Sequence, residues 1–485
     1  MNKPLRRVAL AMMVMVVLLM GNATYIQVIQ ADELREDSRN KRTQFEEFAR
    51  ERGQIIAGGQ SLARSVPNED NRYKWLRTYP NGPTYAPVTG FYSFYYGSNG
   101  IERAEDKILT GKDDSLAFDR LSDMITGKES RGGSVELTIN TAMQEVAYKE
   151  LTSKGFTGSV VALDPRSGEI LTMVNAPSYD PGLLASTDNN EVAKQWDNLS
   201  GADGNPMANR AVSEIYPPGS TFKLITTAAA LQNGYKPDSK VETAARIPLP
   251  GTASATLPNY GSNTCRGDTL TAAVAYSCNT AFAKIAGELG PDKMRETAAA
   301  FGFGDDLQIP MSVAKSDLGA MADQAALYQS GIGQRDVRVT PMQNAMMTAA
   351  IANGGKLMKP QLVKNTRSPD MSELDTFQPE EMKQSVSPEV ASMLREMMIQ
   401  SEKYTKGSGK ISNVSIASKT GTAQHGDVGD KPHGWYVAFA PAENPTIAVA
   451  VIVENGGDEG AEATGGSVAA PIGREVIRAG LQGGG

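Results

Sequence analysis

The sequence predicts a multidomain α+β protein that begins with a membrane-anchoring segment. Its 485 residues exceed the usual size of one domain. An uncharged apolar run at residues 8–20 follows a short basic N-terminus. From about residue 155 onward, strand patterns occur near both ends of the remaining chain and helix patterns lie between them, an arrangement typical of one α+β domain.

The N-terminus predicts an uncleaved, single-pass anchor within residues 1–30. Lys3, Arg6 and Arg7 precede the apolar run, and a weaker apolar stretch continues it to residue 29. The same pattern fits a signal peptide cleaved after the small residues at 21–23, but apolar character that continues past this point favours the anchor. In both cases the positive residues stay in the cytoplasm and the bulk of the chain is exported.

A first, small domain is predicted over residues 31–155. Residues 31–52 are highly charged and are typical of a helix or an extended segment beside the membrane. The aromatic cluster at residues 90–102 predicts a small hydrophobic core. A strand followed by a helix is predicted at residues 134–151.

The second predicted domain runs from residue 156 to 485. It opens with a hairpin whose turn is Asp-Pro-Arg-Ser-Gly at residues 164–168. An alanine-rich helix follows Ser220 and ends at Gly234. A strand at residues 413–424, an apolar hairpin at 434–456 and a closing helix at 467–481 complete the domain.

Composition excludes several classes of function. The net charge is -7 and the chain has no long basic run, which argues against nucleic-acid binding. Two histidines, His425 and His433, and two cysteines are too few for a usual structural zinc site, so we expect no metal. In an oxidising compartment Cys265 and Cys278 can form a disulfide; two buried, reduced thiols are the alternative.

The segment "YPPGSTFK" at residues 216–223 contains the main candidate for chemistry. Ser-x-x-Lys occurs three times, at Ser38, Ser220 and Ser312, but only Ser220 follows a Pro-Pro-Gly break and opens an apolar helix. Lys223 would lie on the same helix face, where a lysine with a lowered pKa can act as a base. The alternative is structural: Ser220 caps the helix and Lys223 reaches to solvent.

Two further short motifs favour the catalytic interpretation. Ser277 and Asn279 form a Ser-x-Asn motif 57 residues after Ser220, and Lys419-Thr420-Gly421-Thr422 lies on a predicted strand. Each motif is common alone. In this order, after a Ser-x-x-Lys motif and in an exported protein, they are the pattern of penicillin-binding proteins and serine β-lactamases.

On these residues the sequence resembles the class B penicillin-binding proteins, and within them the short penicillin-binding protein A type. Nearly the whole chain carries the likeness, including "RGQIIAGGQSLARS" (52–65), "ALDPRSGEILTMVNAPSYDP" (162–181), "NRAVSEIYPPGSTFK" (209–223) and "GIGQRDVRVTPMQ" (331–343). The resemblance implies a membrane anchor, a pedestal domain over 31–155 and a transpeptidase domain over 156–485. That last domain would have a β-lactamase-like antiparallel sheet flanked by helices.

The resemblance also implies roles for the motif residues. Ser220 would attack the D-Ala-D-Ala carbonyl of a peptidoglycan stem peptide and Lys223 would accept its proton. Ser277 would relay protons, Lys419 would complete the electrostatic network, and Asn279 would bind the donor peptide and hold Lys223. The substrate-binding residues implied by the resemblance are Thr420, Gly421 and Thr422, and the hydroxyls of Thr420 and Thr422 would hold the terminal carboxylate.

Two geometric expectations accompany these roles. The backbone N–H groups of Ser220 and Thr422 would form an oxyanion hole. Strict strand alternation puts Lys419 and Thr420 on opposite faces of the sheet, so we expect their strand to twist or to lie at an edge.

The implied substrates are a D-Ala-D-Ala donor and an amine acceptor, with penicillins and other β-lactams as inhibitors and no cofactor. Two alternatives use the same residues: a D,D-carboxypeptidase, and a non-catalytic β-lactam-binding scaffold of the cell wall. A β-lactamase is less consistent, because no Glu-x-x-Leu-Asn segment follows Ser220. The resemblance further implies a catalytic domain outside the cytoplasmic membrane, and contact with division or elongation machinery by analogy alone.

Overall fold

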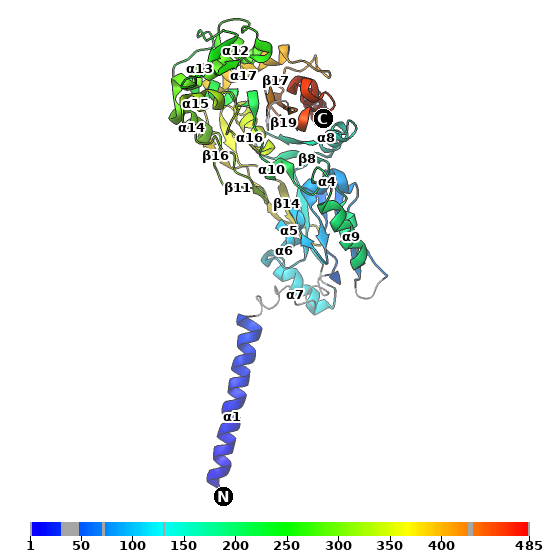
Figure 1. The fold of residues 1–485 in the computed structure, drawn as a ribbon. Helices are drawn as coiled ribbons and strands as arrows, with labels where there is room; N and C mark the ends of the chain where they lie inside the picture. Colours follow the sequence, from blue (N-terminus) through cyan, green and yellow to red (C-terminus); the bar gives the residue numbers. More distant parts are fainter. Residues whose placement is uncertain (1, 31–47, 70–72, 130, 425–429, 484–485) are drawn as a thin grey trace.

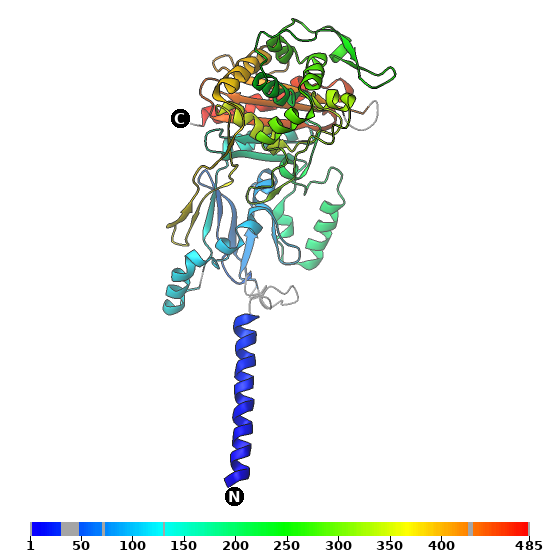
Figure 2. The ribbon, with the colours of Figure 1, turned by 90° about the vertical axis from the view of Figure 1, so that its left-hand side faces the viewer.

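A computed structural model describes residues 2–30, 48–69, 73–129, 131–424 and 430–483 of the chain. Figures 1 and 2 show an elongated molecule in which one long helix leads to a smaller N-terminal region, with a larger C-terminal region beyond it. Most of the charged segment predicted at residues 31–52, namely 31–47, lies outside the described residues.

The N-terminal helix has the length and composition of a membrane span. It consists of α1 (Asn2–Thr24) and one π-helical segment, η1 (Tyr25–Ile29). Within the described residues, Lys3–Ile29 is the one helix long and apolar enough to cross a bilayer. Its apolar stretch is not buried against the rest of the chain. A helix of this length, about 40 Å, exceeds the roughly 30 Å of a hydrocarbon core.

The N-terminal region is built on a six-stranded sheet with the order β15-β14-β6-β1-β2-β3. Its other elements are small helices and one short hairpin. The elements of this region are β1 (Ile55–Ala57), β2 (Gln60–Pro67), β3 (Trp75–Thr78), α4 (Gly82–Thr89), β4 (Tyr92–Ser93), β5 (Gly97–Ser98), α5 (Gly100–Ala104), α6 (Asp106–Leu109), η2 (Asp114–Leu116), α7 (Ala117–Thr126) and β6 (Ser134–Leu137).

Two strands of this sheet come from far along the chain. β14 (Val363–Arg367) pairs antiparallel with β6, and β15 (Glu373–Thr376) pairs with β14. The predicted domain boundary at residue 155 does not account for these two strands, which lie far beyond it in the sequence. The boundary itself stays a prediction. The shared sheet links the two regions by backbone hydrogen bonds.

A buried ion cluster lies inside the N-terminal region. The Glu102 carboxylate accepts hydrogen bonds from Arg52 Nε and Arg77 Nε, both at 2.6 Å, and all three side chains are almost completely buried. Burial alone would raise the pKa of Glu102, but the charges of Arg77 and Arg52 outweigh it and lower the pKa below its ordinary value. Glu102 is therefore an ionised carboxylate that pairs with two buried cations, and Asp106 supplies a second negative charge to Arg52 at 2.7 Å.

The C-terminal region is built on a five-stranded antiparallel sheet with the order β17-β18-β19-β7-β8. Its strands are β7 (Gly158–Leu163), β8 (Ile170–Ala176), β17 (Ala417–Ala423), β18 (His433–Ala440) and β19 (Ile447–Val453). The hairpins and the strand predicted from the sequence are confirmed. All residues of β18 and β19 are buried, because helices cover both faces of the sheet.

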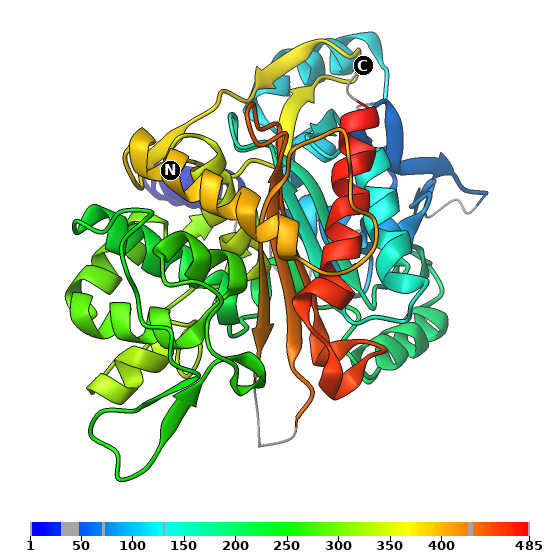
Figure 3. The same cartoon turned by 90° about the horizontal axis from the view of Figure 1, so that it is seen from above.

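The two faces have separate hydrophobic cores. One face packs against α8 (Thr141–Thr152) and the closing helix α18 (Ala470–Gln482), and its strand residues alternate with those of the opposite face. The opposite face packs against α16 (Pro341–Ala352) and the helices around it. Figure 3 shows the sheet between these two helical layers.

The remaining elements of the C-terminal region are helices and short hairpins, most of them on the α16 side. They are η3 (Pro181–Leu184), α9 (Asn189–Ser200), α10 (Arg210–Ser213), η4 (Gly219–Thr221), α11 (Lys223–Gln232), β9 (Arg246–Pro248), β10 (Thr256–Pro258), η5 (Tyr260–Ser262), α12 (Leu270–Tyr276), α13 (Asn279–Leu289), α14 (Pro291–Ala300), β11 (Leu307–Gln308), β12 (Ser312–Val313), α15 (Gln324–Ser330), β13 (Lys356–Met358), β16 (Glu381–Gln384), α17 (Pro388–Tyr404), η6 (Glu454–Gly456), η7 (Gly460–Glu462) and η8 (Gly465–Ala469).

Candidate active site

Ser220 lies in a tight turn immediately before a buried helix. The turn is the 3₁₀ segment η4, and α11 begins three residues later at Lys223. Neither segment has a side-chain capping bond at its N-terminus, so the structural alternative in which Ser220 caps the helix is wrong. The Ser220 side chain is half-buried, and within the described part of the chain its hydroxyl has no hydrogen-bond partner.

The turn requires a glycine just before the serine. Gly219 has a φ of 54°, a conformation that glycine adopts without strain. A Cβ at this position would lie 2.8 Å from the carbonyl oxygen of Thr422. Gly219 therefore lets the turn that carries Ser220 approach the backbone of strand β17.

Segments that the sequence analysis did not assign to the site hold this turn in place. The N–H of Gly219 donates to the carbonyl of Gly333 at 2.9 Å. The indole N–H of Trp435, on β18, donates to the carbonyl of Pro217 at 3.0 Å. A buried tryptophan needs a hydrogen-bond acceptor for its N–H. The position of Trp435 in an apolar strand pattern was therefore the one sequence signal for this contact.

Lys223 is fully buried and directs its amine toward the second motif. Its Nζ donates to the Ser277 carbonyl at 2.7 Å, to Asn279 Oδ1 at 2.7 Å and to Ser277 Oγ at 3.2 Å. Its hydrogen bonds within the described residues do not include Ser220. The helix-face argument brought Lys223 to the right side of the helix, but Asn279 and Ser277 set the direction of its amine.

Ser277 occupies the junction of two helices in a left-handed backbone conformation. It follows α12 with a φ of 59°, and α13 begins two residues later. Its Oγ accepts from Lys223 Nζ at 3.2 Å and from Lys419 Nζ at 2.9 Å. With both lone pairs occupied in this way, the hydroxyl proton of Ser277 is left to be donated to another group.

Burial lowers the pKa values of both lysines, and repulsion by Lys419 lowers that of Lys223 further. Burial is the main cause for Lys223, the charge of Lys419 is the second, and together they lower its pKa well below the ordinary lysine value. Burial lowers the pKa of Lys419 to about 7. A neutral lysine amine, which can accept a proton, is therefore accessible near neutral pH.

Strand β17 lies at the edge of the sheet, which resolves the alternation problem raised by the sequence. Lys419, Gly421 and Ala423 are buried on one face, and Thr420 and Thr422 are half-buried on the other. Because β17 pairs with β18 alone, the opposite edge of its backbone faces the turn at Ser220. Lys419 Nζ also donates to the carbonyl of Thr420 at 3.0 Å, around this edge.

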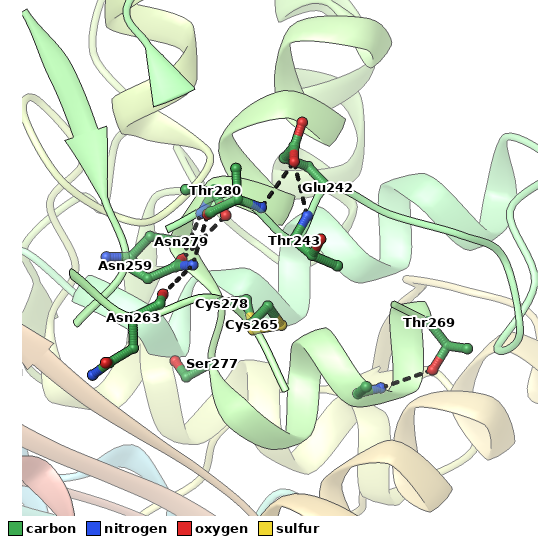
Figure 4. Close-up of a disulfide and its surroundings, with 12 residues drawn as sticks. Glu242, Thr243, Asn259, Asn263, Cys265, Thr269, Ser277, Cys278, Asn279 and Thr280 are labelled. Atoms are coloured by element: carbon green, nitrogen blue, oxygen red, sulfur yellow. Dashed lines mark hydrogen bonds between the residues drawn. A yellow bond between two sulfur atoms is a disulfide. The ribbon is translucent and has the colours of Figure 1, made fainter. Parts of the chain in front are cut away.

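A disulfide joins Cys265 to Cys278, the residue between Ser277 and Asn279. The two Cα atoms are 5.7 Å apart, and the cysteines are 13 residues apart in sequence. Figure 4 shows the sulfur–sulfur bond beside the segment that carries Ser277 and Asn279. Asn279 Nδ2 also donates to the carbonyl of Pro258 at 3.0 Å, so the loop before α12 is tied to the second motif at two points.

The other sequence candidates lie away from this cluster or outside the description. Ser312 is exposed on β12 and exchanges hydrogen bonds with Gln308, while Lys315 pairs with Asp306 at 3.0 Å. Ser38 and His425 lie outside the described residues. His433 is buried at the start of β18, where its Nδ1 accepts from the N–H of Asn455 at 3.1 Å.

Comparisons with known proteins find similar domains and full-length relatives. Residues 158–478 match the family described as penicillin binding protein transpeptidase domain, and residues 52–135 match the penicillin binding protein A dimerisation domain. The chain is 51% identical, over 99% of both chains, to a protein of Mycolicibacterium smegmatis named peptidoglycan D,D-transpeptidase PbpA. A protein of the same name from Mycobacterium tuberculosis is 48% identical over the full length of both chains.

A solved structure extends this similarity to three dimensions. It is penicillin-binding protein A from M. tuberculosis as a ceftriaxone acyl-enzyme complex. It superposes on this chain with a TM-score of 0.88 at 48% identity and covers 90% of this chain and 100% of the other.

Proposed function

This chain belongs to the penicillin-binding protein transpeptidase family, and we propose that it cross-links peptidoglycan through an acyl-enzyme on Ser220. The activity is that of a peptidoglycan D,D-transpeptidase. The observation that carries the assignment of residues is the convergence of Lys223, Ser277, Asn279 and Lys419 in one buried hydrogen-bonded cluster next to the turn of Ser220.

The first step is the attack of Ser220 Oγ on the carbonyl between the two D-alanines. Lys223, whose pKa is lowered by burial and by the charge of Lys419, takes the hydroxyl proton directly or through Ser277. The new C–O bond forms an ester and the amide C–N bond breaks. The leaving D-alanine takes up a proton, which Ser277 is placed to donate and Lys223 to replace.

An oxyanion hole supports this step. The carbonyl of Thr422 faces the Ser220 turn, and in an extended strand the N–H and C=O of one residue point to the same side. The Thr422 N–H is thus directed to the edge of β17 that faces the turn of Ser220. Each such donor is worth about 3–4 kcal/mol of transition-state stabilisation in other enzymes.

The terminal carboxylate of the donor peptide binds at the edge of β17. Thr420 and Thr422 present half-buried hydroxyls there, and Lys419 supplies positive charge from the other side of the strand. Gly421 keeps this edge close to the turn, since a Cβ at 421 would lie 2.8 Å from the carbonyl of Pro218. The donor is thereby held with its scissile carbonyl next to Ser220.

In the second half-reaction an amine of a neighbouring stem peptide attacks the ester and releases Ser220. β-Lactams enter the same first step: the ring amide opens, but the leaving nitrogen stays attached to the acyl group and hinders the incoming amine. Acylation by a penicillin is therefore expected to be stable.

We also propose the orientation of the chain in the membrane. Lys3, Arg6 and Arg7 before the apolar helix support a cytoplasmic N-terminus and a catalytic region on the outside. Contact with division or elongation machinery rests on family analogy alone, and the N-terminal region would be the surface for it.

A cross-linking assay tests the proposed function. The full chain is incubated with a D-Ala-D-Ala stem peptide and a labelled amine acceptor, and the products are separated by mass. We expect a cross-linked product that is lost in Ser220→Ala. Release of D-alanine without cross-linking would indicate the D,D-carboxypeptidase, and no turnover by a folded protein would indicate the scaffold.

A further inference from the structure

Helix α7 presents its apolar side chains to the outside of the protein. Phe118, Leu121, Met124 and Ile125 are 81%, 51%, 76% and 77% exposed. The spacing of Phe118, Leu121 and Ile125 places them along one stripe of the helix. A surface helix ordinarily turns such a stripe toward the core, so α7 is reversed.

The inner face of α7 is polar. The outward direction of its apolar stripe is therefore set by the sequence of the helix itself. Arg120 is half-buried and donates to the carbonyl of Gly111 at 2.9 Å, a backbone contact that fixes the rotation of the helix. Asp123 is also half-buried. The helix is thus held by polar contacts on one side and leaves its apolar stripe free on the other.

The segment that carries α7 begins and ends beside the point where the chain enters the N-terminal region from the anchor. The N–H of Gly53 donates to Leu109, before α7, and the N–H of Gly132, after α7, donates to Glu51, both at 2.9 Å. Only residues 31–47 separate the anchor helix from this part of the chain. Figures 1 and 2 both show α7 at the end of the N-terminal region nearest to α1.

We propose that α7 is a second membrane contact, which lies flat in the lipid interface beside the transmembrane anchor with Phe118, Leu121, Met124 and Ile125 among the acyl chains. A lipid surface fits better than a second protein, because α7 is only about 15 Å long and one stripe on it is small against the roughly 800 Å² that each partner of a stable complex buries.

The charges near α7 indicate how it binds. Lys112, Arg120 and Lys128 alternate with acidic residues in the same segment, so no net basic patch attracts anionic headgroups. Insertion is driven by the burial of apolar surface. It is therefore insensitive to salt and to the fraction of anionic lipid. The contact would hold the catalytic region at a fixed tilt above the membrane.

Fluorescence on the full chain in lipid vesicles tests this proposal. The native cysteines are joined in a disulfide, so a single introduced cysteine can carry an environment-sensitive dye. Ile125→Cys places the dye on the apolar stripe, and Thr126→Cys, exposed on another side of the same helix, is the matched control. The vesicles contain phosphatidylcholine and phosphatidylglycerol, with or without a spin label near the top of the acyl chain.

We expect the dye at residue 125 to emit at shorter wavelength and to be quenched several-fold more strongly by the lipid spin label than the dye at residue 126. Thermal unfolding of each labelled variant checks that it is folded. Equal access of both dyes to aqueous iodide would overturn the proposal. Shielding of residue 125 from iodide without quenching by the lipid would also overturn it and would indicate a second copy of the chain or another protein on this face.

Discussion

Lys223 and Lys419 both donate hydrogen bonds to one hydroxyl, that of Ser277, inside a buried cluster. Two cations so close in a poorly solvated site repel each other, and burial penalises each charge further. The cluster therefore favours loss of a proton. This explains how lysines, whose ordinary pKa is above 10, can serve as the base at neutral pH.

The pKa of Lys419 predicts a pH-dependent stability. Its folded pKa of about 7 lies below its unfolded value of about 10.4, so unfolding takes up a proton between these two pH values. The free energy of unfolding should rise with pH in this window, by up to about 1.4 kcal/mol per pH unit. In Lys419→Met the free energy of unfolding should rise less steeply with pH. This variant lacks the lysine, and without its charge the pKa of Lys223 is lowered less.

Urea unfolding of both proteins in detergent, at several values between about pH 7 and pH 9, measures the two slopes. Parallel slopes would show that Lys419 is not deprotonated by folding. Below the folded pKa of Lys419 both states hold its proton, so this lysine adds nothing to the slope there.

Asn279 is expected to orient Lys223 for catalysis. Asn279→Ala removes the acceptor that lies 2.7 Å from Lys223 Nζ, so the Lys223 amine keeps hydrogen bonds to Ser277 alone. A hydrogen bond to a charged or strongly polar group is worth about 1.5–3 kcal/mol, so acylation by benzylpenicillin should slow by roughly 10- to 100-fold. Asn233→Ala, at the end of α11 opposite to Lys223, is the control and should acylate at the wild-type rate. Equal rates for the two variants would remove Asn279 from the mechanism.

At the scale of elements, the sequence predicted those parts of the fold that local patterns determine. The hairpin of β7 and β8, the helix after Ser220 and the hairpin of β18 and β19 follow from turn residues and apolar runs. The pairing of β14 and β15 with the N-terminal sheet was not predicted, because strand pairing across more than 200 residues leaves no local signal in the sequence.

The sequence predicted which motif residues the fold brings together and said less about their geometry, and the catalytic roles of these residues stay predictions. Three motifs in order identified Ser220, Lys223, Ser277, Asn279 and Lys419, since such motifs need only residue types and spacing. The direction of Lys223 toward Ser277 depends on the left-handed backbone at Ser277, a conformation that serine rarely adopts. The supports at Gly333 and Trp435 depend on tertiary packing alone.

The approach of the η4 turn to β17 can be tested with one methyl group. In Gly421→Ala the new Cβ would lie 2.8 Å from the Pro218 carbonyl and 3.1 Å from Thr221, so the turn and the strand must separate. Because this spacing sets the oxyanion hole, we expect acylation to slow by about 10²-fold or more while the protein stays folded.

The matched control for this change is Gly466→Ala, whose Cβ would have its closest contact at an ordinary 3.4 Å. It should acylate normally. Pre-steady-state acylation by a fluorescent penicillin measures both variants. A wild-type rate in Gly421→Ala would mean that the close approach is not needed for the chemistry.

At the scale of the whole molecule, the two regions are joined by more than a linker. β14 and β15 complete the N-terminal sheet, and α8, which follows β6, covers the C-terminal sheet. Loss of either sheet would therefore remove packing from the other. We expect the N-terminal and C-terminal regions to unfold together.

Glu102 tests this coupling. Glu102→Ala removes the carboxylate that pairs with buried Arg77 and leaves buried Arg52 with Asp106 alone, which should cost about 3–5 kcal/mol. The temperature at which the protein loses labelling by a fluorescent penicillin should fall, although Ser220 lies in the other region. Glu129→Ala, which removes only the exposed pair with Lys74, should change stability by less than about 1 kcal/mol. Unchanged loss of labelling in Glu102→Ala would mean that the regions unfold independently.

Intact mass after incubation with benzylpenicillin shows whether Ser220 is the nucleophile of this transpeptidase. We expect one stable equivalent of drug, located by peptide mapping on the peptide that contains Ser220 and absent in Ser220→Ala. An adduct that persists in Ser220→Ala, or one that maps to another serine, would contradict it.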